Sequence, residues 1–486
     1  MTSKIFELTY PQQRCLRDRY RYMMRTAYLA AFALTLATTN LAATETTDEV
    51  GWAQLSRIVA RIKQPEFPHR EFLITDHGAI GDGKTDCKSA FEKAIEACQE
   101  AGGGRVVVPK GTWLVQGPIH LKSNVELNTA VDAKILFGCS PSDYLPRVYT
   151  RFEGTELMNY SPPIYAFEQE NVALTGEGTL DAQGGAKCWW SWKGPWGGEA
   201  DHGWEEGDPD QREAVAKLIK LADDHVPTEE RIFGEGSYLR PSFVQFYRCK
   251  NVLVEGVRIT NSPMWCIHPV LCENLTVRNV RVFSYGPNND GCNPESCRNV
   301  LIEGCQFDCG DDCIAIKSGR NADGRRIAAP SENIVIRDCN MKDGHGGIVL
   351  GSEMSGGIRN VFAENCTMDS PHLERAIRLK SNSLRGGYLE NLYVRNIQVG
   401  TVSDAVIRVN LLYSSDRGEH PPRVSNIHIE NVTSQNSKYP FCMNGLEHYP
   451  IENVILENCI FKNAKKPSIV DGVKELTLKQ VRIIPE

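Results

Sequence analysis

The sequence predicts an all-β protein, built as a single right-handed parallel β-helix with an N-terminal capping helix. Two observations carry this prediction: a strand-like motif recurs along the C-terminal half, and several cysteines follow the same repeat. The chain has 486 residues, of which 41% are hydrophobic and 24% charged, so it can build a large core. Two or three domains would be usual at this length, but a solenoid can place all of it in one domain.

The recurring motif is an asparagine, then alternating apolar residues, then a turn-like pair. Its copies begin at Asn251, Asn274, Asn299, Asn333, Asn360, Asn391, Asn426 and Asn453, and a weaker copy begins at Asn171. Steps of about 20 to 50 residues are typical of stacked repeats. Within each copy the apolar period is two, which indicates a strand. No helical pattern separates the copies, so the sequence favours a β-helix over a βα solenoid.

Four cysteines occupy one slot of the motif, six residues after its asparagine. They are Cys305, Cys339, Cys366 and Cys459. Other copies hold valine or isoleucine there, so the slot is interior and these thiols are expected to stay free. A zinc site is disfavoured, because close CxxC pairs are lacking. Local disulfides at Cys292–Cys297 or Cys309–Cys313 remain open alternatives.

The first 43 residues have the order of a secretory signal. A basic flank from Arg14 to Arg25 precedes a mostly apolar stretch at 26–39, and small residues follow. The stretch is short for a membrane span, which needs about 20 residues, although an uncleaved anchor stays possible. We expect residues 1–43 to be removed, 44–70 to form a linker or N-terminal segment and 71–486 to form the β-helix catalytic domain. The protein is then exported, to the periplasm or beyond, with no stable membrane insertion.

Two features precede the main run of repeats. Asp86 is expected to N-cap a helix that runs to about Ala101, where Gly102–Gly104 end it. An insertion at about 183–239 interrupts the coils and holds five of the eight tryptophans, followed by a helical stretch near 211–224. Clustered tryptophans either stack on sugar rings or pack a loop, and the sequence does not separate these alternatives.

The formal net charge is −7, so no global basic field attracts a polyanion. Nucleic-acid binding is therefore not expected. A polyanionic sugar remains compatible with this charge if the cleft itself is locally basic. No metal or cofactor is expected.

Polar clusters recur at intervals of about one coil. They are Asn288-Asn289-Asp290, Gly310-Asp311-Asp312, Gly344-His345-Gly346, Arg378-Leu379-Lys380 and, at a further interval, Tyr413. Residues one coil apart lie about 4.8 Å apart on one wall, so the aspartates should converge, with Arg378 and Lys380 two coils away. Adjacent Asp311 and Asp312 point oppositely in a regular strand. Both can reach one cleft only if the backbone turns at Gly310.

Three close carboxyls suit the hydrolysis of an acetal, which needs an acid for the leaving oxygen and a base for water. Mutual repulsion should raise the pKa of at least one of them. Arg378 and Lys380 either neutralise these acids or grip the carboxylate of a uronate sugar. Taken singly, an Asp–Asp pair is ordinary turn chemistry and His345 has a structural role; the common register favours a site.

In these clusters the sequence resembles family 28 glycoside hydrolases, the polygalacturonases, from about Ile74 to the C-terminus. Asn289 and Leu379 depart from the family's usual threonine and isoleucine. The resemblance implies a pectin-lyase-like solenoid that hydrolyses α-1,4-galacturonosidic bonds in pectin with inversion. Asp311 would be the acid, supported by His345, while Asp290 and Asp312 would activate water. Substrate would be bound by Asn288, Arg378, Lys380 and Tyr413.

The segment 347–357, GIVLGSEMSGG, looks like that of the exo-acting bacterial branch of this family. The tryptophan-rich insertion could close one end of the cleft and so enforce attack from a chain terminus. Alternatives are a calcium-dependent pectate lyase or a hydrolase of another pectic polymer on the same solenoid, and a non-catalytic glycan-binding β-helix.

Overall fold

The computed structural model describes residues 51–198 and 201–486. Contacts divide the chain into residues 1–54 and 55–486. In the first unit the described residues form one 3-10 turn, η1 (Gly51–Gln54). The predicted signal segment, 1–43, lies outside the described residues. No described helix has the length and apolar character needed to cross a membrane.

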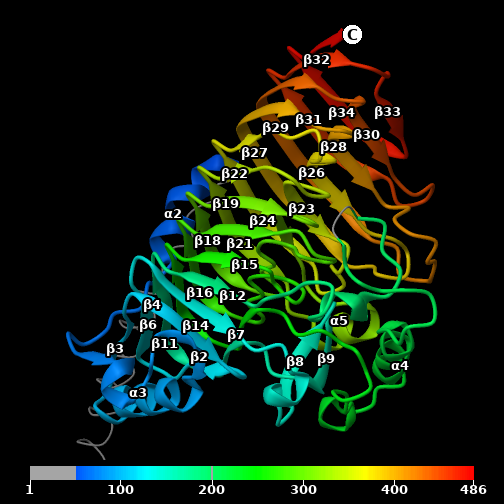
Figure 1. Ribbon diagram of the computed structural model, residues 1–486. Helices are drawn as coiled ribbons and strands as arrows, with labels where there is room; N and C mark the ends of the chain where they lie inside the picture. The colour runs from blue at the N-terminus through cyan, green and yellow to red at the C-terminus, as the bar shows by residue number, and fades with distance from the viewer. Residues whose placement is uncertain (1–50, 199–200) are drawn as a thin grey trace, which may run out of the picture. The chain divides into compact units, whose positions relative to one another are not determined.

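Residues 55–486 form a parallel β-helix in which successive coils contribute strands to three walls, seen as a ladder of arrows in Figure 1. Successive coils pair in parallel, as a solenoid requires, and the prediction of a right-handed parallel β-helix is confirmed. The first wall contains β1 (Glu71–Leu73), β3 (Gly104–Val108), β6 (Val125–Thr129), β11 (Glu170–Gly176), β14 (Lys250–Glu255), β16 (Glu273–Arg278), β18 (Arg298–Glu303), β21 (Ser331–Arg337), β24 (Ile358–Glu364), the starts of β27 (Tyr388–Thr401) and β29 (Arg423–Asn436), β31 (Ile451–Glu457) and β34 (Val473–Lys479).

The second wall follows the first within each coil. It contains β2 (Asp82–Asp86), β4 (Gly111–Val115), β7 (Ala133–Phe137), β12 (Thr179–Asp181), β15 (Arg258–Thr260), β17 (Arg281–Ser284), β19 (Gln306–Cys309), β22 (Asn340–Met341), β25 (Thr367–Met368), the ends of β27 and β29, β32 (Ile460–Ala464) and β35 (Arg482–Pro485). Apolar side chains from these walls fill an interior that is continuous along the stack.

The third wall carries the polar clusters found in the sequence. It contains β5 (Ile119–His120), β10 (Ile164–Phe167), β13 (Val244–Tyr247), the bridged segments 267–270 and 292–295, β20 (Ile314–Ile316), β23 (Ile348–Gly351), β26 (Arg375–Lys380), β28 (Ala405–Asn410), β30 (Tyr439–Asn444) and β33 (Ile469–Asp471). Its register aligns Ile314 with Ile348 and Ile377, so that side chains from successive coils lie side by side.

The repeat asparagines form a ladder along the edge of the first wall. From Asn171 to Asn453, each side-chain amide donates a hydrogen bond to the amide oxygen of the asparagine one coil earlier, at 2.9–3.4 Å. Every member has a positive φ, which asparagine tolerates better than most residues. The ladder starts at Asn124, one coil before the first copy recognised in the sequence.

The N-terminal end of the stack is covered by α3 (Lys88–Glu100), which buries Phe91, Ile95 and Cys98. The predicted capping helix is thus present, but its N-cap is Cys87 rather than Asp86. Asp86 lies one residue earlier, and its Oδ1 accepts hydrogen bonds from the backbone of Lys88 at 3.0 Å and of Gln116 at 3.0 Å. Its carboxylate therefore connects the helix start to the coil below.

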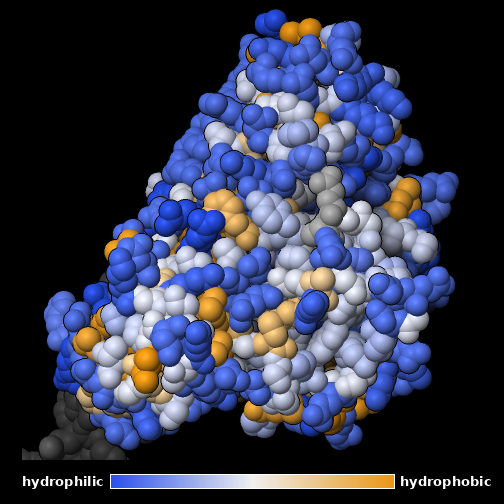
Figure 2. Space-filling model, viewed as in Figure 1, coloured by the Kyte–Doolittle hydropathy of each residue, from blue (hydrophilic) through white to orange (hydrophobic). Residues whose placement is uncertain are grey.

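Other helices lie on the outside of the coils. They are α2 (Leu55–Arg61), α4 (Arg212–Asp223), α5 (Asn321–Ile327), and the 3-10 turns η2 (Ile74–His77), η3 (Pro141–Tyr144), η4 (Trp190–Lys193) and η5 (Thr228–Glu230). A hairpin of β8 (Val148–Phe152) and β9 (Thr155–Asn159) lies with α4 and α5 on one side of the stack (Figure 1). The face shown in Figure 2 is mostly hydrophilic, with small scattered hydrophobic groups.

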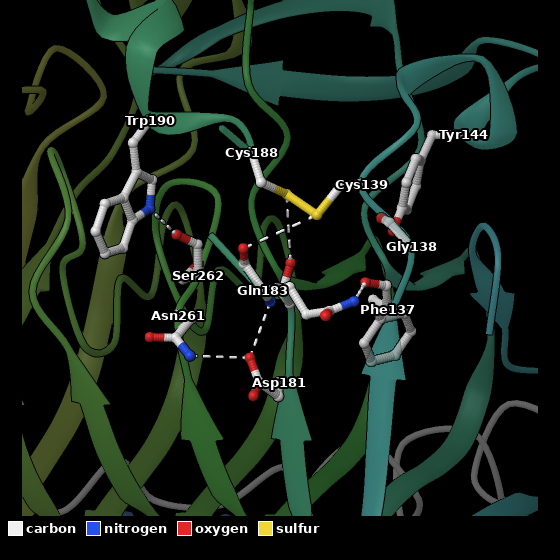
Figure 3. Close-up of a disulfide and its surroundings, with 11 residues drawn as sticks. Phe137, Gly138, Cys139, Tyr144, Asp181, Gln183, Cys188, Trp190, Asn261 and Ser262 are labelled. Carbon is white, nitrogen blue, oxygen red and sulfur yellow. Dashed lines mark hydrogen bonds between the residues drawn. A yellow bond between two sulfur atoms is a disulfide. The ribbon is translucent and has the colours of Figure 1, made fainter. Parts of the chain in front are cut away.

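The four cysteines of the repeat slot are buried and free, as predicted. The local disulfides at Cys292–Cys297 and Cys309–Cys313 do not form, because all four of these cysteines are buried free thiols. Among the described residues the disulfide is instead Cys139–Cys188, which joins the segment after β7 to the start of the tryptophan-rich insertion (Figure 3). Beside it, Trp190 Nε1 donates to the Ser262 carbonyl at 2.8 Å.

Candidate active site

The three aspartates lie at the start of successive third-wall segments. Gly291, next to Asp290, donates its backbone N–H to the Asp312 carbonyl at 2.9 Å. Asp311 and Asp312 lie just before β20, whose first residue, Ile314, pairs laterally with Cys292, two residues after Asp290. All three line one cleft of about 400 Å³. The stacking that the spacing predicted therefore brings these carboxyls to one place.

Adjacent Asp311 and Asp312 share the cleft because the chain bends before β20. Gly310 is not in a strand, and a Cβ there would lie 2.6 Å from the backbone of Tyr285, so glycine is needed for close approach of the two coils. Asp312 donates its backbone N–H to Asp311 Oδ1 at 2.9 Å, which stabilises the bend. The turn expected at Gly310 is present.

Asp312 is the most strongly paired acid of the three. Arg378 Nη1 donates to its Oδ1 at 3.1 Å, and Lys380 Nζ donates to its Oδ2 at 2.6 Å. As expected from the spacing, Arg378 and Lys380 lie on β26, two strands from β20. Their long side chains reach across the intervening strand to Asp312. Burial alone would raise the pKa of Asp312, but Lys380 and Arg378 hold this pKa below its ordinary value.

Asp290 is also buried but less well compensated. Its Oδ2 accepts from Asn293 Nδ2 at 2.7 Å and lies 3.6 Å from Lys317 Nζ. Burial, reinforced by the charge of Asp311, raises the pKa of Asp290 well above its ordinary value. Asp290 is therefore the acid of the three whose pKa is raised, and burial contributes more to this than the mutual repulsion that the sequence led us to expect.

Asp311 forms a pair with His345, whose Nδ1 lies 2.9 Å from Asp311 Oδ1. The His345 backbone N–H donates to the Asp311 carbonyl at 3.2 Å, which fixes the two residues together. Burial favours the neutral carboxyl, but His345 and then Lys380 outweigh it and lower the pKa of Asp311. The same pairing raises the pKa of His345 to about 9. The pair thus holds one proton, mainly on the imidazole.

Asn288 and Tyr413 also line this cleft. Asn288 Oδ1 accepts from Arg240 Nη2 at 2.8 Å, so its amide is held in one orientation. The Tyr413 ring lies beneath Arg378 and Lys380, with its centroid 5.7 Å and 5.4 Å from the two cations. All eight residues singled out in the sequence therefore line one cleft.

Sequence reasoning missed several residues of the same cleft, above all Lys317 and Glu353. Lys317 Nζ lies 3.1 Å from Glu353 Oε2 and 4.6 Å from the centroid of the Trp265 ring. The negative charges of Glu353 and Asp290 raise the pKa of Lys317 against the opposite effect of burial. Lys317 follows β20 directly and lies in register with Lys380. The spacing of the coils could therefore have identified Lys317 as a residue of the cleft.

Irregular segments supply the remaining sides of the cleft. Glu153 comes from the tip of the β8–β9 hairpin and pairs with Arg320 at 2.8 Å. Arg385 comes from the loop after β26, and Lys193 and Trp196 come from the insertion. Of the five tryptophans there, Trp189 and Trp190 are buried in a cluster with Tyr144 and Tyr160, whereas Trp196 lines the cleft. The tryptophans of the insertion therefore serve both purposes: some pack the loop and one lines the cleft.

Comparison with known proteins supports the same grouping. The model of Glycosyl hydrolases family 28 matches residues 234–480, and a model named Rhamnogalacturonase A/epimerase, pectate lyase-like, matches residues 72–129. The chain is 49% identical to an exopolygalacturonase of Thermotoga maritima, covering 90% of this chain and 96% of that one, with a TM-score of 0.86.

Two curated relatives are more distant. The chain is 28% identical to a probable polygalacturonase of Vitis vinifera, over 78% of this chain and 71% of that protein. It is 27% identical to an exo-poly-alpha-D-galacturonosidase of Dickeya chrysanthemi, over 75% of this chain and 62% of that protein. With the family model spanning half of the chain and the polar clusters in one cleft, this chain belongs to glycosyl hydrolases family 28.

Proposed function

We propose that this protein hydrolyses α-1,4-galacturonosidic bonds in polygalacturonate, releasing galacturonate from a chain end with inversion. The observation that carries the proposal is the convergence of three buried carboxyls and a group of cations in one cleft. Carboxyls supply acid and base for a glycosidic bond, and arginine and lysine bind carboxylates. The named activities of the similar proteins from Thermotoga maritima and Dickeya chrysanthemi agree with this assignment.

Asp311 is assigned the role of general acid. Its hydrogen bond to His345 places a proton donor 2.9 Å from the carboxylate, and the raised pKa of His345 keeps that proton in place to about pH 9. Transfer of this proton across the hydrogen bond yields neutral Asp311 and neutral His345. The neutral carboxyl can then protonate the leaving glycosidic oxygen.

Asp312 and Asp290 are assigned to the attacking water. Asp312 is kept ionised by Arg378 and Lys380, as a base must be. Asp290, whose pKa is raised by burial and by the charge of Asp311, is assigned as the second hydrogen-bond partner of the water.

Arg378 and Lys380 are assigned to the galacturonate carboxylate, with Asn288 and Tyr413 at the sugar. Both cations already contact Asp312, so a bound uronate would share them rather than find them free. A carboxylate placed there draws part of their charge away from Asp312 and makes Asp312 a stronger base. Binding and activation of water are thereby connected.

The exo mode is supported by the segments that border the cleft. Glu153 and Arg320, which form an ion pair, line it from outside the regular coils, and Lys193 and Trp196 line it from the insertion. The segment 347–357, which resembles exo-acting relatives, supplies Ser352 and Glu353 to the same cleft. A pocket of this size suits a chain end better than the middle of a polymer.

Product analysis on polygalacturonate tests the proposal. Galacturonate should be the sole early product, and viscosity should fall slowly relative to the release of reducing sugar. Rapid loss of viscosity at low bond cleavage would instead show endo attack. Unsaturated products that absorb in the ultraviolet and disappear on chelation would show a lyase, and binding without turnover would show a glycan-binding protein.

We also propose that the protein acts outside the cytoplasm. The basic and apolar pattern of residues 1–43 supports export, as does the Cys139–Cys188 disulfide, since disulfides persist mainly in oxidising compartments. Fractionation of expressing cells checks this: the mature protein should be found in the periplasm or medium, with a new N-terminus near residue 44.

A further inference from the structure

Arg240 is a buried arginine whose hydrogen-bond acceptors, among the described residues, are neutral oxygens rather than carboxylates. It directly follows the insertion, and its side chain is fully buried. Its Nη1 donates to the carbonyls of Pro263 at 3.0 Å and Pro287 at 2.7 Å, and its Nη2 donates to Asn288 Oδ1 at 2.8 Å. Arginine is rarely buried without a charged partner, so packing alone does not explain its presence here.

The turn that carries Asn288 is held at two points. Asn289 is fully buried, and its side-chain amide donates to the Met264 carbonyl at 3.0 Å, which ties the backbone of the turn to the preceding coil. This contact also supports Asp290, the next residue, without any help from Arg240. The side chain of Asn288, by contrast, is bonded by Arg240. Arg240 therefore controls the amide of Asn288 more directly than it controls the carboxyl of Asp290.

The orientation of the Asn288 amide follows from this partner. A guanidinium can only donate hydrogen bonds, so the atom of Asn288 that faces Arg240 must be the oxygen. Burial lowers the pKa of Arg240 to about 10, which still leaves the guanidinium protonated at neutral pH. The other amide atom, Nδ2, is bonded to none of the described residues, while Asn288 is half-exposed and lines the cleft. Asn288 therefore offers an N–H donor to a ligand in the cleft.

We propose that Arg240 is a positioning residue of the reaction, which keeps the amide N–H of Asn288 directed at an oxygen of the bound galacturonide. If Arg240 is lost, the amide can rotate by half a turn and present its oxygen instead. That oxygen would repel the acceptor-only oxygens of the sugar, namely the ring, bridging and carboxylate oxygens. This role rests on the proposed function and adds to it the residue that sets the polarity of one substrate contact.

A double-mutant cycle on trigalacturonate tests whether Arg240 acts through Asn288. Arg240→Lys keeps the charge but loses the forked donor, and Asn288→Gly removes the amide at a position with a φ of 55°, which glycine adopts without strain. We expect each single variant to raise KM about five- to tenfold, with kcat changed by less than about threefold. The double variant should have the KM of Asn288→Gly within about twofold, because the same contact can be lost only once.

Effects on KM that multiply in the double variant, or a fall in kcat with KM unchanged, overturn this role while leaving the proposed function intact. Failure of the parent protein to release galacturonate counts against both. Arg231→Lys is the matched control, because Arg231 is also buried and donates to a backbone carbonyl at 2.8 Å, but lies outside the cleft lining. It should lower the unfolding temperature and keep the KM of the parent. A KM raised equally in this control also overturns the role.

Asn288→Asp provides a second test that leaves Arg240 in place. The new carboxylate can accept from Arg240, so the buried guanidinium gains a charged partner, and the unfolding temperature should be at least that of the parent. No N–H then faces the cleft, and KM for trigalacturonate should rise about tenfold or more. A KM equal to that of the parent overturns the role of Arg240, even if Arg240→Lys does not fold.

Discussion

His345 Nδ1 and Asp311 Oδ1 lie 2.9 Å apart, and the backbones of the two residues are hydrogen-bonded as well. The pairing raises the pKa of His345 to about 9 and lowers that of Asp311. His345 can pass its proton to Asp311 across their hydrogen bond. Asp311 can therefore act as the acid even though its carboxyl is ionised at the start of the reaction. This arrangement reconciles the assigned role of Asp311 as acid with its lowered pKa.

The first prediction separates the acid from the base by using the leaving group. Asp311→Asn should lower kcat on trigalacturonate by about 10² to 10⁴, since proton donation is worth about that much. An aryl galacturonide with a good leaving group needs no acid, so the loss there should be about tenfold or less. Asp312→Asn should be impaired on both substrates. Equal losses of Asp311→Asn on both substrates would contradict the assignment.

The second prediction concerns pH. The proton on His345 is present below about pH 9 and is lost above it, so kcat/KM should decline through that region. In His345→Gln, the Asp311 carboxyl loses its source of a proton. The decline in kcat/KM should therefore begin at a pH lower by at least about two units. Rate profiles from pH 4 to 10 measure the shift. His428→Gln, on β29 and outside the cleft, is the matched control and should keep the parent profile.

The site could be predicted from spacing because a solenoid converts intervals along the chain into lateral contacts. Asp290 and Asp312 are separated along the chain, yet one coil brings their backbones into register. Lys317 was missed although the same register applies to it, because it belongs to no motif. Glu153 and Lys193 could not have been predicted, since they come from a hairpin and an insertion that follow no repeat.

The fold was predictable for the same reason, and its exceptions lie outside the repeats. Cys305 occupies a slot that valine fills elsewhere, which identified it as a buried free thiol. Cys139 and Cys188 occupy no such slot, so nothing in the periodicity indicated that they pair. The repeat pattern did not identify Asn124, because its coil has a weaker motif, although this residue starts the asparagine ladder.

The third prediction tests a buried ion pair beside the cleft. Glu295 is fully buried; its carboxylate lies 3.1 Å from Arg151 and accepts from the backbone of Gly319 at 3.0 Å. Glu295→Gln removes the nearer carboxylate of Arg151 and leaves it with Glu156 at 3.5 Å, which should lower the free energy of unfolding by about 3 kcal/mol. Glu168→Gln is the matched control, because its partner Arg248 is exposed and such pairs contribute about 1 kcal/mol or less. Thermal unfolding should therefore show a large decrease for the first and little change for the second.

The fourth prediction concerns acid stability. Burial would raise the pKa of Glu156, but Arg151 and hydrogen bonds from Tyr149 and Tyr247 lower this pKa to about 2. A depressed pKa adds stability above the unfolded pKa of about 4.3, and that stability is lost as the pH falls toward 2. The unfolding temperature should therefore decrease steeply between pH 4.5 and 2. Glu156→Gln should begin at a lower unfolding temperature and vary less over the same range; a parallel decrease would show that other carboxyls control acid stability.

The fifth prediction concerns the disulfide that secures the insertion. Cys139 and Cys188 are separated by 49 residues, for which loop entropy alone gives about 4 kcal/mol. Cys139→Ser should lower the unfolding temperature, and a reducing agent should lower that of the parent protein but not that of the variant. Cys305→Val is the matched control, because valine fills the equivalent slot in other coils and the thiol there is free. Since Trp196 of the insertion lines the cleft, loss of the disulfide should also raise KM for trigalacturonate. Unchanged stability together with unchanged KM would mean that packing of Trp189 and Trp190 alone holds the insertion in place.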